Sequence, residues 1–301
     1  METIEKKELE LPNGETLAYR MRKGGDQIAL LVHGNMNSSI NWDLLMENMD
    51  ENFTIYAPDL RGFGDSSYFT PIESIRDLSE DLKHFADALK LDEFHIVGWS
   101  LGGVVTMRFL LDHQKCVDRA VLLSTGSVKG FPVKKRTFFG LKESNEFIND
   151  LESMQAFVKP IEKMKQKNRR FMIKWMMKKS LYSEEKPDKE RFDAYIDAMI
   201  KQRNLADVNL ALARFNIDTG SNGLVEGTDE AGHINKPTLI IHGDVDKVVS
   251  VQEAHDTKTA IGDNAMLNIL PNVGHAALVD DLDDTVRKIQ EFLQGKELLQ
   301  F

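Results

Sequence analysis

Short, almost continuously apolar runs alternate with amphipathic segments in two separate stretches of the chain. The run FHIVGWS (94–100) follows residues 73–90, in which apolar residues recur at helical spacing, and the run PTLIIHG (237–243) precedes the helical pattern of residues 251–260. Strands that are apolar throughout need a helical layer on each face of their sheet. The sequence therefore predicts an α/β fold with a mostly parallel central sheet flanked by helices.

The middle of the chain interrupts this alternation. Residues 127–236 show mostly helical patterns and contain 21 Lys and Arg against 16 Asp and Glu, a net charge of +5, whereas the rest of the chain has a net charge of −15. Such a shift between two strand–helix regions is typical of an inserted unit. We expect residues 1–126 and 237–301 to form one core and residues 127–236 to form a helical cap.

Composition excludes several classes of protein. The 301 residues are 42% hydrophobic and 29% charged, as in soluble globular proteins, and no apolar run approaches the roughly 18 residues of a membrane span. The charged start METIEKKELE lacks the apolar core of a secretory signal, and the single cysteine, Cys116, cannot form an internal disulfide or a thiolate metal cluster. We expect a cytoplasmic protein with no metal site and no stable membrane insertion. Its net charge of −10 argues against nucleic acid as a partner, and a homodimer stays open.

Ser100 lies in the sequence Gly98-Trp99-Ser100-Leu101-Gly102-Gly103, where an apolar strand ends and a helix begins. A serine on such a turn is held in a strained backbone with its hydroxyl exposed, and the start of the helix favours an anion. The simpler alternative is that the hydroxyl caps the helix. The strand-to-helix context favours a nucleophile.

A nucleophilic serine needs a base. His275 follows the last predicted strand, and the loops after parallel strands face one crevice, so we expect His275 to be that base. His233, in the loop that leaves the insertion, is its rival among the eight histidines.

The base in turn needs an acid to orient it. Asp244 and Asp246 both follow the strand at 237–243, and both could reach an imidazole. We favour Asp246 and expect Asp244 to stabilise its own turn.

Two backbone N–H groups should stabilise the oxyanion of an acyl-transfer intermediate. Leu101, directly after the candidate nucleophile, would supply one, and Asn35, in the loop after the strand QIALLVHG, would supply the other. The preceding His33–Gly34 equally fits a simple strand-ending turn. Trp99, which precedes Ser100, and Met36, which follows Asn35, are expected to line the substrate pocket.

The chain resembles the capped, serine-nucleophile branch of the α/β-hydrolase fold superfamily. The motifs that carry the resemblance are HGN (33–35), APDLRGFGDSS (57–67), GWSLGG (98–103), HGDVDKVV (242–249) and NVGHAAL (272–278). They occur in the superfamily's order of nucleophile, acid and histidine, and they span about residues 28–126 and 237–295. The resemblance implies a mobile helical cap in the insertion. It is specific for fold and triad and weakly specific for substrate.

Departures from relatives narrow the chemistry. Haloalkane dehalogenases and epoxide hydrolases of this fold are similar but have Asp where this chain has Ser100, so those activities are not expected. The loop after His33 also lacks the multiple glycines of the hormone-sensitive-lipase-like group. Asp59, Gly62 and Gly64 are expected to shape a loop beside the site rather than take part in catalysis.

The predicted cap contains a basic segment, KPIEKMKQKNRRFMIKWMMKK (159–179), with nine Lys and Arg and one Glu. Its residues Phe171, Met172, Trp175 and Met176 fall on one helical face. Three interpretations stay open. The face packs on the core, or it is a lid in which Phe171 and Trp175 line an apolar substrate pocket, or the helix touches anionic lipid.

Together these residues predict a serine hydrolase, an esterase, acting on a small to medium, largely apolar carboxylic ester or close acyl analogue. Ser100 attacks the carbonyl to form an acyl-enzyme, His275 transfers the proton, and Asp246 orients the imidazole. The partner is a small-molecule substrate, and no cofactor is required. The alternatives are hydrolysis of a lactone, thioester or carbon–carbon bond, or a lyase step, on the same triad. A non-enzymatic hydrolase-like receptor is the second alternative.

Overall fold

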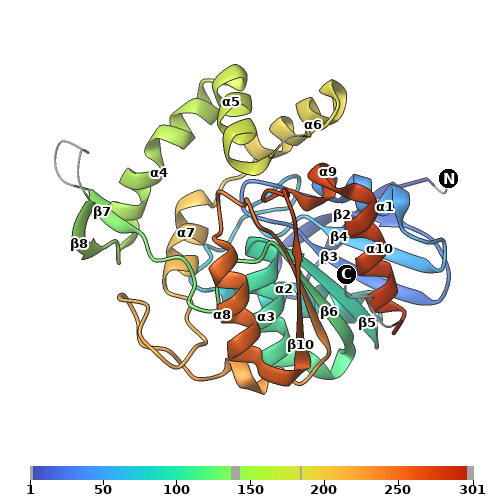
Figure 1. The fold of residues 1–301 in the computed structure, drawn as a ribbon. Coiled ribbons are helices and arrows are strands. Elements are labelled where there is room, and N and C mark those ends of the chain that lie inside the picture. The colour runs from blue at the N-terminus through green and yellow to red at the C-terminus, as the bar shows by residue number, and fades with distance from the viewer. Residues whose placement is uncertain (1–2, 137–142, 184, 297–301) are drawn as a thin grey trace.

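The computed structural model describes residues 3–136, 143–183 and 185–296. Eight strands form one sheet in the order β1-β2-β4-β3-β5-β6-β9-β10 (Figure 1). Strand β2 pairs antiparallel with β1 and with β4, and the six strands from β4 to β10 pair in parallel. The strands are β1 (Glu5–Glu10), β2 (Thr16–Arg22), β3 (Gln27–Val32), β4 (Phe53–Pro58), β5 (Phe94–Trp99), β6 (Val117–Leu123), β9 (Thr238–Gly243) and β10 (Ala265–Leu270).

Helices cover both faces of this sheet, because successive strand residues point to opposite sides. On β3, Leu30 and Val32 join one hydrophobic cluster and Ala29 and Leu31 join the other. The first cluster includes side chains of α2 (Ile75–Ala88), α3 (Leu101–His113) and α8 (Val251–Ile261), and the second includes α1 (Asp43–Asn48), α9 (Ala277–Asp280) and α10 (Leu282–Leu293). The predicted α/β fold with a mostly parallel, helix-flanked sheet is confirmed.

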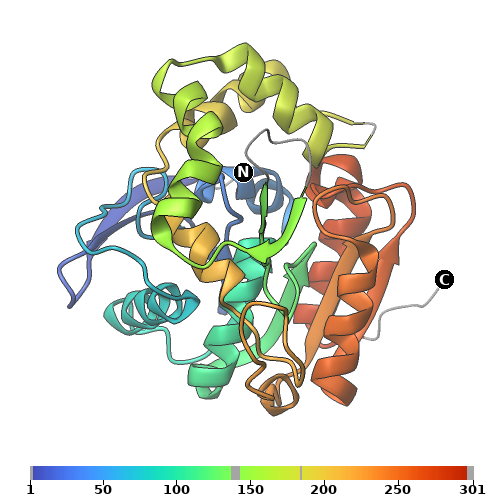
Figure 2. The same ribbon diagram turned by 90° about the vertical axis from the view of Figure 1, so that its left-hand side faces the viewer.

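Residues 127–236, called here the inserted segment, leave the sheet after β6 and return to β9, although β6 and β9 are neighbours. Helices α4, α5 and α6 stand above the sheet (Figures 1 and 2). The segment contains the hairpin β7 (Lys134–Arg136) and β8 (Glu143–Phe147), then α4 (Leu151–Gln166), α5 (Arg170–Leu181), α6 (Lys189–Ile200) and α7 (Leu205–Ala213).

The inserted segment is less uniform than its helical patterns predict. The hairpin β7–β8 was not expected, since neither strand has the β-branched run that marks a strand. Helix α7 packs on one face of the sheet, because its Val208 and Ala211 belong to the same hydrophobic cluster as Leu30 and Val32 of β3. Helices α5 and α6 join the cluster of the other face, which contains Ala29 and Leu31 of β3. The returning end of the segment therefore packs on the core.

Neither a bilayer span nor a metal cluster is found in the described ranges. None of their helices has the length and apolarity needed to cross a membrane. These ranges also contain no group of three or more His, Cys, Asp or Glu placed to hold a metal ion.

Candidate active site

Ser100 occupies the sharp turn between β5 and α3. Its φ of +57° and ψ of −117° place a non-glycine residue in a backbone region that costs energy. Surrounding hydrogen bonds hold this conformation: Ser100 N–H donates to Leu123 O (3.0 Å), and Gly103 and Gly126 donate to Ser100 O (3.0 and 3.2 Å). The turn is fixed from both sides, with the serine half-buried at its apex.

Two glycines let the backbone approach Ser100 closely. A Cβ at Gly102 would lie 1.9 Å from Val32 O, and a Cβ at Gly98 would lie 2.3 Å from Gly102 O. Any side chain there would push α3 away from β3 and β5. Glycine at both positions therefore allows the loop that follows β3 to lie against the start of α3.

His275 and Asp246 form a buried, hydrogen-bonded pair. His275 Nδ1 lies 2.7 Å from Asp246 Oδ2, and Asp246 Oδ1 accepts from the N–H groups of Val248 (2.7 Å) and Val249 (3.0 Å). Burial acts to raise the pKa of Asp246, but the hydrogen bonds from His275 and these N–H groups hold it below its usual range. Because the carboxylate only accepts, the proton of neutral His275 lies on Nδ1 and the lone pair on Nε2.

His242, at the end of β9, is a second imidazole on Asp246 and was not singled out from the sequence. Its Nε2 lies 3.0 Å from Val249 O and 3.3 Å from Asp246 Oδ2, so Nε2 carries the proton. Burial lowers the pKa of His242, which keeps it neutral. The sequence did contain a sign of this role, because the motif HGD places His242 at the end of a strand, a few residues before Asp246.

Asp244 takes no part in the pair formed by His275 and Asp246. It is exposed, and its Oδ1 accepts from Asn272 N–H at 2.7 Å. The expectation that it stabilises its own turn was wrong: the bond reaches the loop that carries His275, because that loop runs beside the end of β9. The rival His233 lies beside Gln114, past the far end of α3. Thirteen helical residues, about 20 Å, separate that end from Ser100.

Trp99 holds the loop of His275 against β5. Its Nε1 donates to His275 O at 2.9 Å, and the side chain is buried. The structure thus places Trp99 beneath the histidine loop. This contact joins the His275 loop to the residue that directly precedes Ser100.

The loop after β3 lies on the other side of Ser100. A Cβ at Gly34 would be only 3.1 Å from Ser100 Cβ. His33, fully buried, fastens this loop, because its Nε2 accepts from Leu60 N–H (2.9 Å) and its Nδ1 donates to Gly34 O (2.8 Å). Burial lowers the pKa of His33, which favours this neutral form.

Asn35 follows in this loop with its side chain engaged as an acceptor. Asn35 Oδ1 accepts from Met36 N–H (3.0 Å) and from Gln202 Nε2 (2.9 Å). The main-chain N–H of Asn35 donates to no residue in the described ranges. Leu101 is the first residue of α3, so its N–H has no acceptor within the helix. The Ser100 hydroxyl likewise has no hydrogen-bond partner among the described residues.

The other three residues expected in the pocket separate into two groups. Met36 is half-buried and packs against a cluster formed by α4 and α7, which includes Met154 and Val158. Phe171 and Trp175 instead lie on the outer face of α5, 83% and 60% exposed. The side of α5 that packs against the core is the opposite one.

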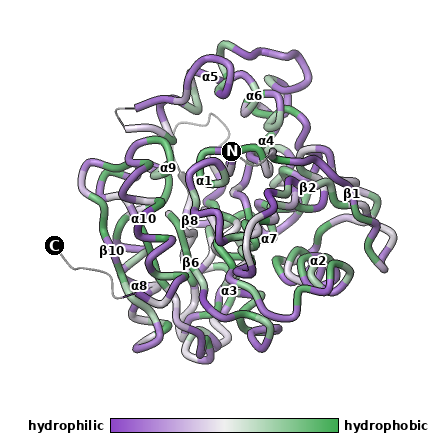
Figure 3. The backbone as a smooth tube through the Cα atoms, turned by 90° about the vertical axis from the view of Figure 1, so that its right-hand side faces the viewer, coloured by the Kyte–Doolittle hydropathy of each residue, from purple (hydrophilic) through white to green (hydrophobic). Residues whose placement is uncertain are grey.

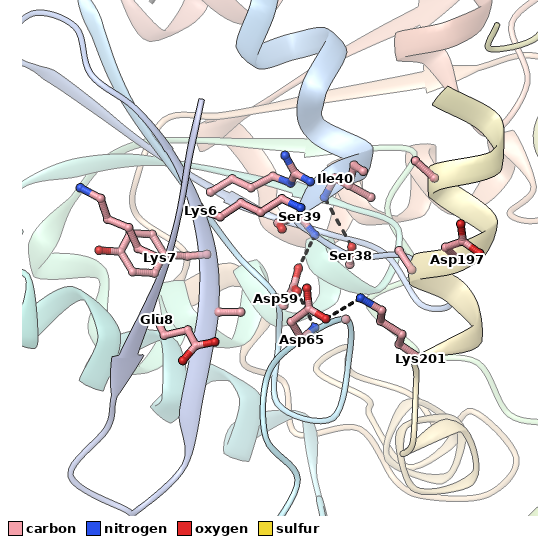
Figure 4. Close-up of a pocket in the computed structure, with 16 residues that line it drawn as sticks. Lys6, Lys7, Glu8, Ser38, Ser39, Ile40, Asp59, Asp65, Asp197 and Lys201 are labelled. Atoms are coloured by element: carbon pink, nitrogen blue, oxygen red, sulfur yellow. Dashed lines mark hydrogen bonds and ion pairs between the residues drawn. The ribbon is translucent and has the colours of Figure 1, made fainter. Parts of the chain in front are cut away.

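A cavity of about 600 Å³ lies apart from Ser100, between the sheet edge and α6 (Figure 4). Most carboxylates that line it already have partners: Asp59 accepts from Ser39 N–H (2.7 Å), and Asp65 pairs with Lys201 (2.6 Å). Asp59 also accepts from Asp65 N–H (2.9 Å), so it joins the two loops at the base of the cavity. This is the loop-shaping role expected of Asp59.

Comparison with known proteins identifies the family. Residues 30–282 match the family described as alpha/beta hydrolase fold. The chain belongs to this family. It is 21% identical over 286 residues to a pimeloyl-[acyl-carrier protein] methyl ester esterase of Vibrio vulnificus, covering 92% of this chain and 97% of that protein. It is 24% identical over 277 residues to a 2-hydroxy-6-oxononadienedioate/2-hydroxy-6-oxononatrienedioate hydrolase of Pseudomonas putida, covering 89% and 88%.

A sequence match over part of the chain and a match to a solved structure are consistent with this family. An uncharacterised protein of Mycobacterium tuberculosis is 34% identical over 116 residues, which are 38% of this chain and only about a third (34%) of that protein's length. The solved structure of a thermophilic esterase from Thermogutta terrifontis superposes with a TM-score of 0.74 at 19% identity, covering 97% of this chain and 98% of that one. This α/β hydrolase is therefore similar to hydrolases, an esterase among them, over about nine tenths of its length (92% and 89%).

Proposed function

We propose that this α/β hydrolase is a serine esterase that cleaves a small to medium, largely apolar carboxylic ester, or a close acyl analogue, through an acyl-enzyme. The observation that carries the proposal is the buried 2.7 Å contact between His275 Nδ1 and Asp246 Oδ2, in a loop that bonds Trp99, the residue before a serine held at φ +57°. It supplies a nucleophile, a base in the right tautomer and an acid that keeps its charge.

In the proposed mechanism, His275 Nε2 takes the proton of Ser100 as Oγ attacks the ester carbonyl. Catalytic hydrogen bonds often close only when substrate binds, which fits a Ser100 hydroxyl that is unpartnered in the free protein. Asp246 stabilises the imidazolium that forms. His275 then donates this proton to the leaving alcohol, and water hydrolyses the acyl-enzyme by the same route.

The oxyanion would lie between the main-chain N–H groups of Asn35 and Leu101. Neither group has another acceptor in the described ranges, so both are available without any rearrangement. Each such donor contributes about 3 kcal/mol to transition-state stabilisation in measured cases.

The inserted segment is proposed to act as the cap over this site and to supply its apolar wall. Met36 directly follows Asn35 and packs against the cluster that contains Met154 and Val158 of α4. Ile161, one turn further along α4, packs against the same cluster. An acyl chain that leaves the oxyanion hole would meet these side chains. This arrangement supports a mostly apolar acyl group.

A second candidate is hydrolysis of a carbon–carbon bond on the same triad. The specific support is the relative from Pseudomonas putida, a hydrolase of a dienedioate, which matches 89% of this chain. That substrate is a dianion by its name, so this candidate predicts activity on a dicarboxylate and little on neutral esters.

The test is hydrolysis of p-nitrophenyl esters, from acetyl to dodecanoyl, by the wild type and by Ser100→Ala. We expect turnover with an optimum in chain length and a loss of about a thousandfold or more in the variant. A fluorophosphonate probe should label the wild type and leave Ser100→Ala unlabelled. Labelling without ester turnover would favour the carbon–carbon candidate, and absence of both would contradict a serine hydrolase and favour a receptor.

A further inference from the structure

Helix α5 exposes an apolar ridge at the outer end of the inserted segment. Phe171 is 83% exposed, Trp175 60% and Met172 50%. Ile173 and Met177, on the opposite side of the helix, are buried in the core cluster. We call the three exposed side chains the α5 ridge. Large apolar side chains that cluster on a surface mark an interaction site rather than packing.

The α5 ridge lies in a strongly basic part of the sequence. Residues 159–179 contain nine Lys and Arg and one Glu, in a chain whose net charge is −10. Two of the nine, Arg170 and Lys174, pair with carboxylates of α6. Lys165 pairs with Glu162, and Lys178 lies over the ring of Phe192. Four of the remaining exposed cations, which make no ion pair within the described ranges, are Lys163, Lys167, Arg169 and Lys179.

We propose that the α5 ridge and these four cations form a peripheral docking surface for an anionic lipid bilayer. Helix α5 lies above the sheet, at the outer end of the molecule (Figures 1 and 2), and hydrophobic and hydrophilic residues alternate along it (Figure 3). Exposed aromatic side chains with lysines and arginines close by in the sequence suit the boundary between headgroups and acyl chains.

Charge selects the kind of bilayer and the orientation on it. The cations attract anionic headgroups, and each contributes to binding near such a surface. The rest of the chain, outside the inserted segment, carries a net charge of −15 and is repelled. Attraction of the cations and repulsion of the acidic remainder would together orient the inserted segment toward the lipid and the rest of the protein away from it. The contact is interfacial, so it agrees with the absence of a spanning helix among the described residues.

A second copy of the chain fits this surface less well. A symmetric dimer places the same patch on both sides of its interface. Two α5 ridges in contact would bring lysines and arginines against each other, with no carboxylate of residues 163–179 between them. The same charges that favour anionic lipid therefore oppose this dimer.

The test uses the full-length protein and vesicles of phosphatidylcholine with or without phosphatidylglycerol. Trp175 is the reporter, because Trp42 and Trp99 are buried. We expect the protein to sediment with the anionic vesicles only, the Trp emission to shift to the blue on binding, and raised salt to release it. Binding is independent of hydrolysis, so Ser100→Ala should bind like the wild type.

Two variants separate the parts of the surface. Phe171→Ala/Trp175→Ala should weaken vesicle binding about tenfold or more, and Lys167→Glu/Arg169→Glu/Lys179→Glu about a hundredfold. The matched control, Lys23→Glu/Lys90→Glu/Lys115→Glu, changes the net charge equally at exposed sites of the core and should bind at least half as well as the wild type. Thermal unfolding of each variant checks its fold.

Several outcomes would overturn the proposal. The wild type could fail to bind anionic vesicles, or bind without a shift in Trp emission. The charge control could lose as much binding as the α5 variants. Sedimentation as a dimer that Phe171→Ala/Trp175→Ala abolishes, without vesicle binding, would assign the surface to a second copy instead.

Discussion

Gln202 Nε2 donates a hydrogen bond to Asn35 Oδ1 over 2.9 Å, which ties the inserted segment to the loop that carries the proposed oxyanion donor. Gln202 follows α6 and is only 3% exposed. Its Nε2 also bonds Asn204 Oδ1 (2.9 Å), and its main-chain O accepts from Lys165 of α4 (2.6 Å). The orientation of Asn35 therefore depends on the position of two elements of the segment.

Replacing Gln202 should lower kcat more than it changes KM. Without the hydrogen bond from Gln202 Nε2, the peptide of Asn35 is held less firmly. Its main-chain N–H is then less often oriented toward the proposed position of the oxyanion. Because the donor itself remains, we expect a loss of about tenfold rather than the hundredfold or more seen when a donor is removed. Steady-state kinetics of Gln202→Leu and Gln202→Glu on the best p-nitrophenyl ester measure this.

The two Gln202 variants distinguish positioning from packing. Glu keeps the size of the side chain and loses the donor, so both variants should lose kcat alike while differing in thermal stability. An unchanged kcat in Gln202→Glu would show that the bond to Asn35 does not position the oxyanion donor.

Asp246→Asn should lower kcat/KM by about ten thousandfold, because the neutral amide no longer holds His275 with its proton on Nδ1. Asp244→Asn is the matched control two residues away. Asp244 only accepts from Asn272 N–H at the surface, so its variant should keep activity within about threefold and lose roughly 1 kcal/mol of unfolding free energy. Ester kinetics and urea unfolding of both variants decide between the two acids, and the reverse ranking would move the role to Asp244.

Much of the core and the candidate site could be predicted because each part depends on local sequence. The apolar runs specify strands, and the loop after each parallel strand must open at the same edge, so the sequence alone groups Ser100, Asp246 and His275 at one crevice. The short helix α1 was missed because its six residues give too little periodicity.

Side-chain direction and long-range partners could not be read in this way. The helical spacing groups Phe171 with Trp175, but only packing decides that Ile173 faces the core and this pair faces outward. Gln202 has no motif around it. Its contact with Asn35 joins residues that are 167 positions apart, so it appears only once the inserted segment is folded back on the loop after β3.

Stability should fall as pH is lowered below about 6.5. Burial lowers the pKa of His33, His95 and His242, so all three stay neutral in the folded protein where they would take up protons in the unfolded chain, whose histidine pKa is about 6.5. The unfolding free energy therefore decreases from about pH 6.5 down to the lower pKa values of the folded state, by at most about 1.4 kcal/mol per pH unit for each histidine. Well above about pH 6.5 the three histidines are neutral in both states, so they do not make the unfolding free energy depend on pH.

Urea unfolding between about pH 5 and 8 measures this dependence. The depressed pKa of Asp246 acts only below about pH 4, so it does not enter the window. His95 lies at the start of β5, at the opposite end of the strand from Ser100. His95→Gln removes one of the three protonating groups, so the unfolding free energy should change less steeply with pH. A slope that stays the same in this variant would contradict the assignment for His95.

Enlarging Ile161 should shift the preferred ester toward shorter acyl chains. Ile161 lies on α4 and packs against the cluster that Met36 joins, where the proposed acyl wall lies. The extra volume of Ile161→Phe would fill space that a long acyl chain needs, and a few methylenes in an apolar pocket change kcat/KM by about tenfold or more. The measurement is kcat/KM across the p-nitrophenyl series, expressed as the ratio of decanoyl to butanoyl. Phe157→Ala, one turn earlier on α4 and 37% exposed, is the control and should leave this ratio unchanged. If Phe157→Ala altered the ratio and Ile161→Phe did not, the acyl chain would run along the outer side of α4, and Met36 would not belong to its pocket.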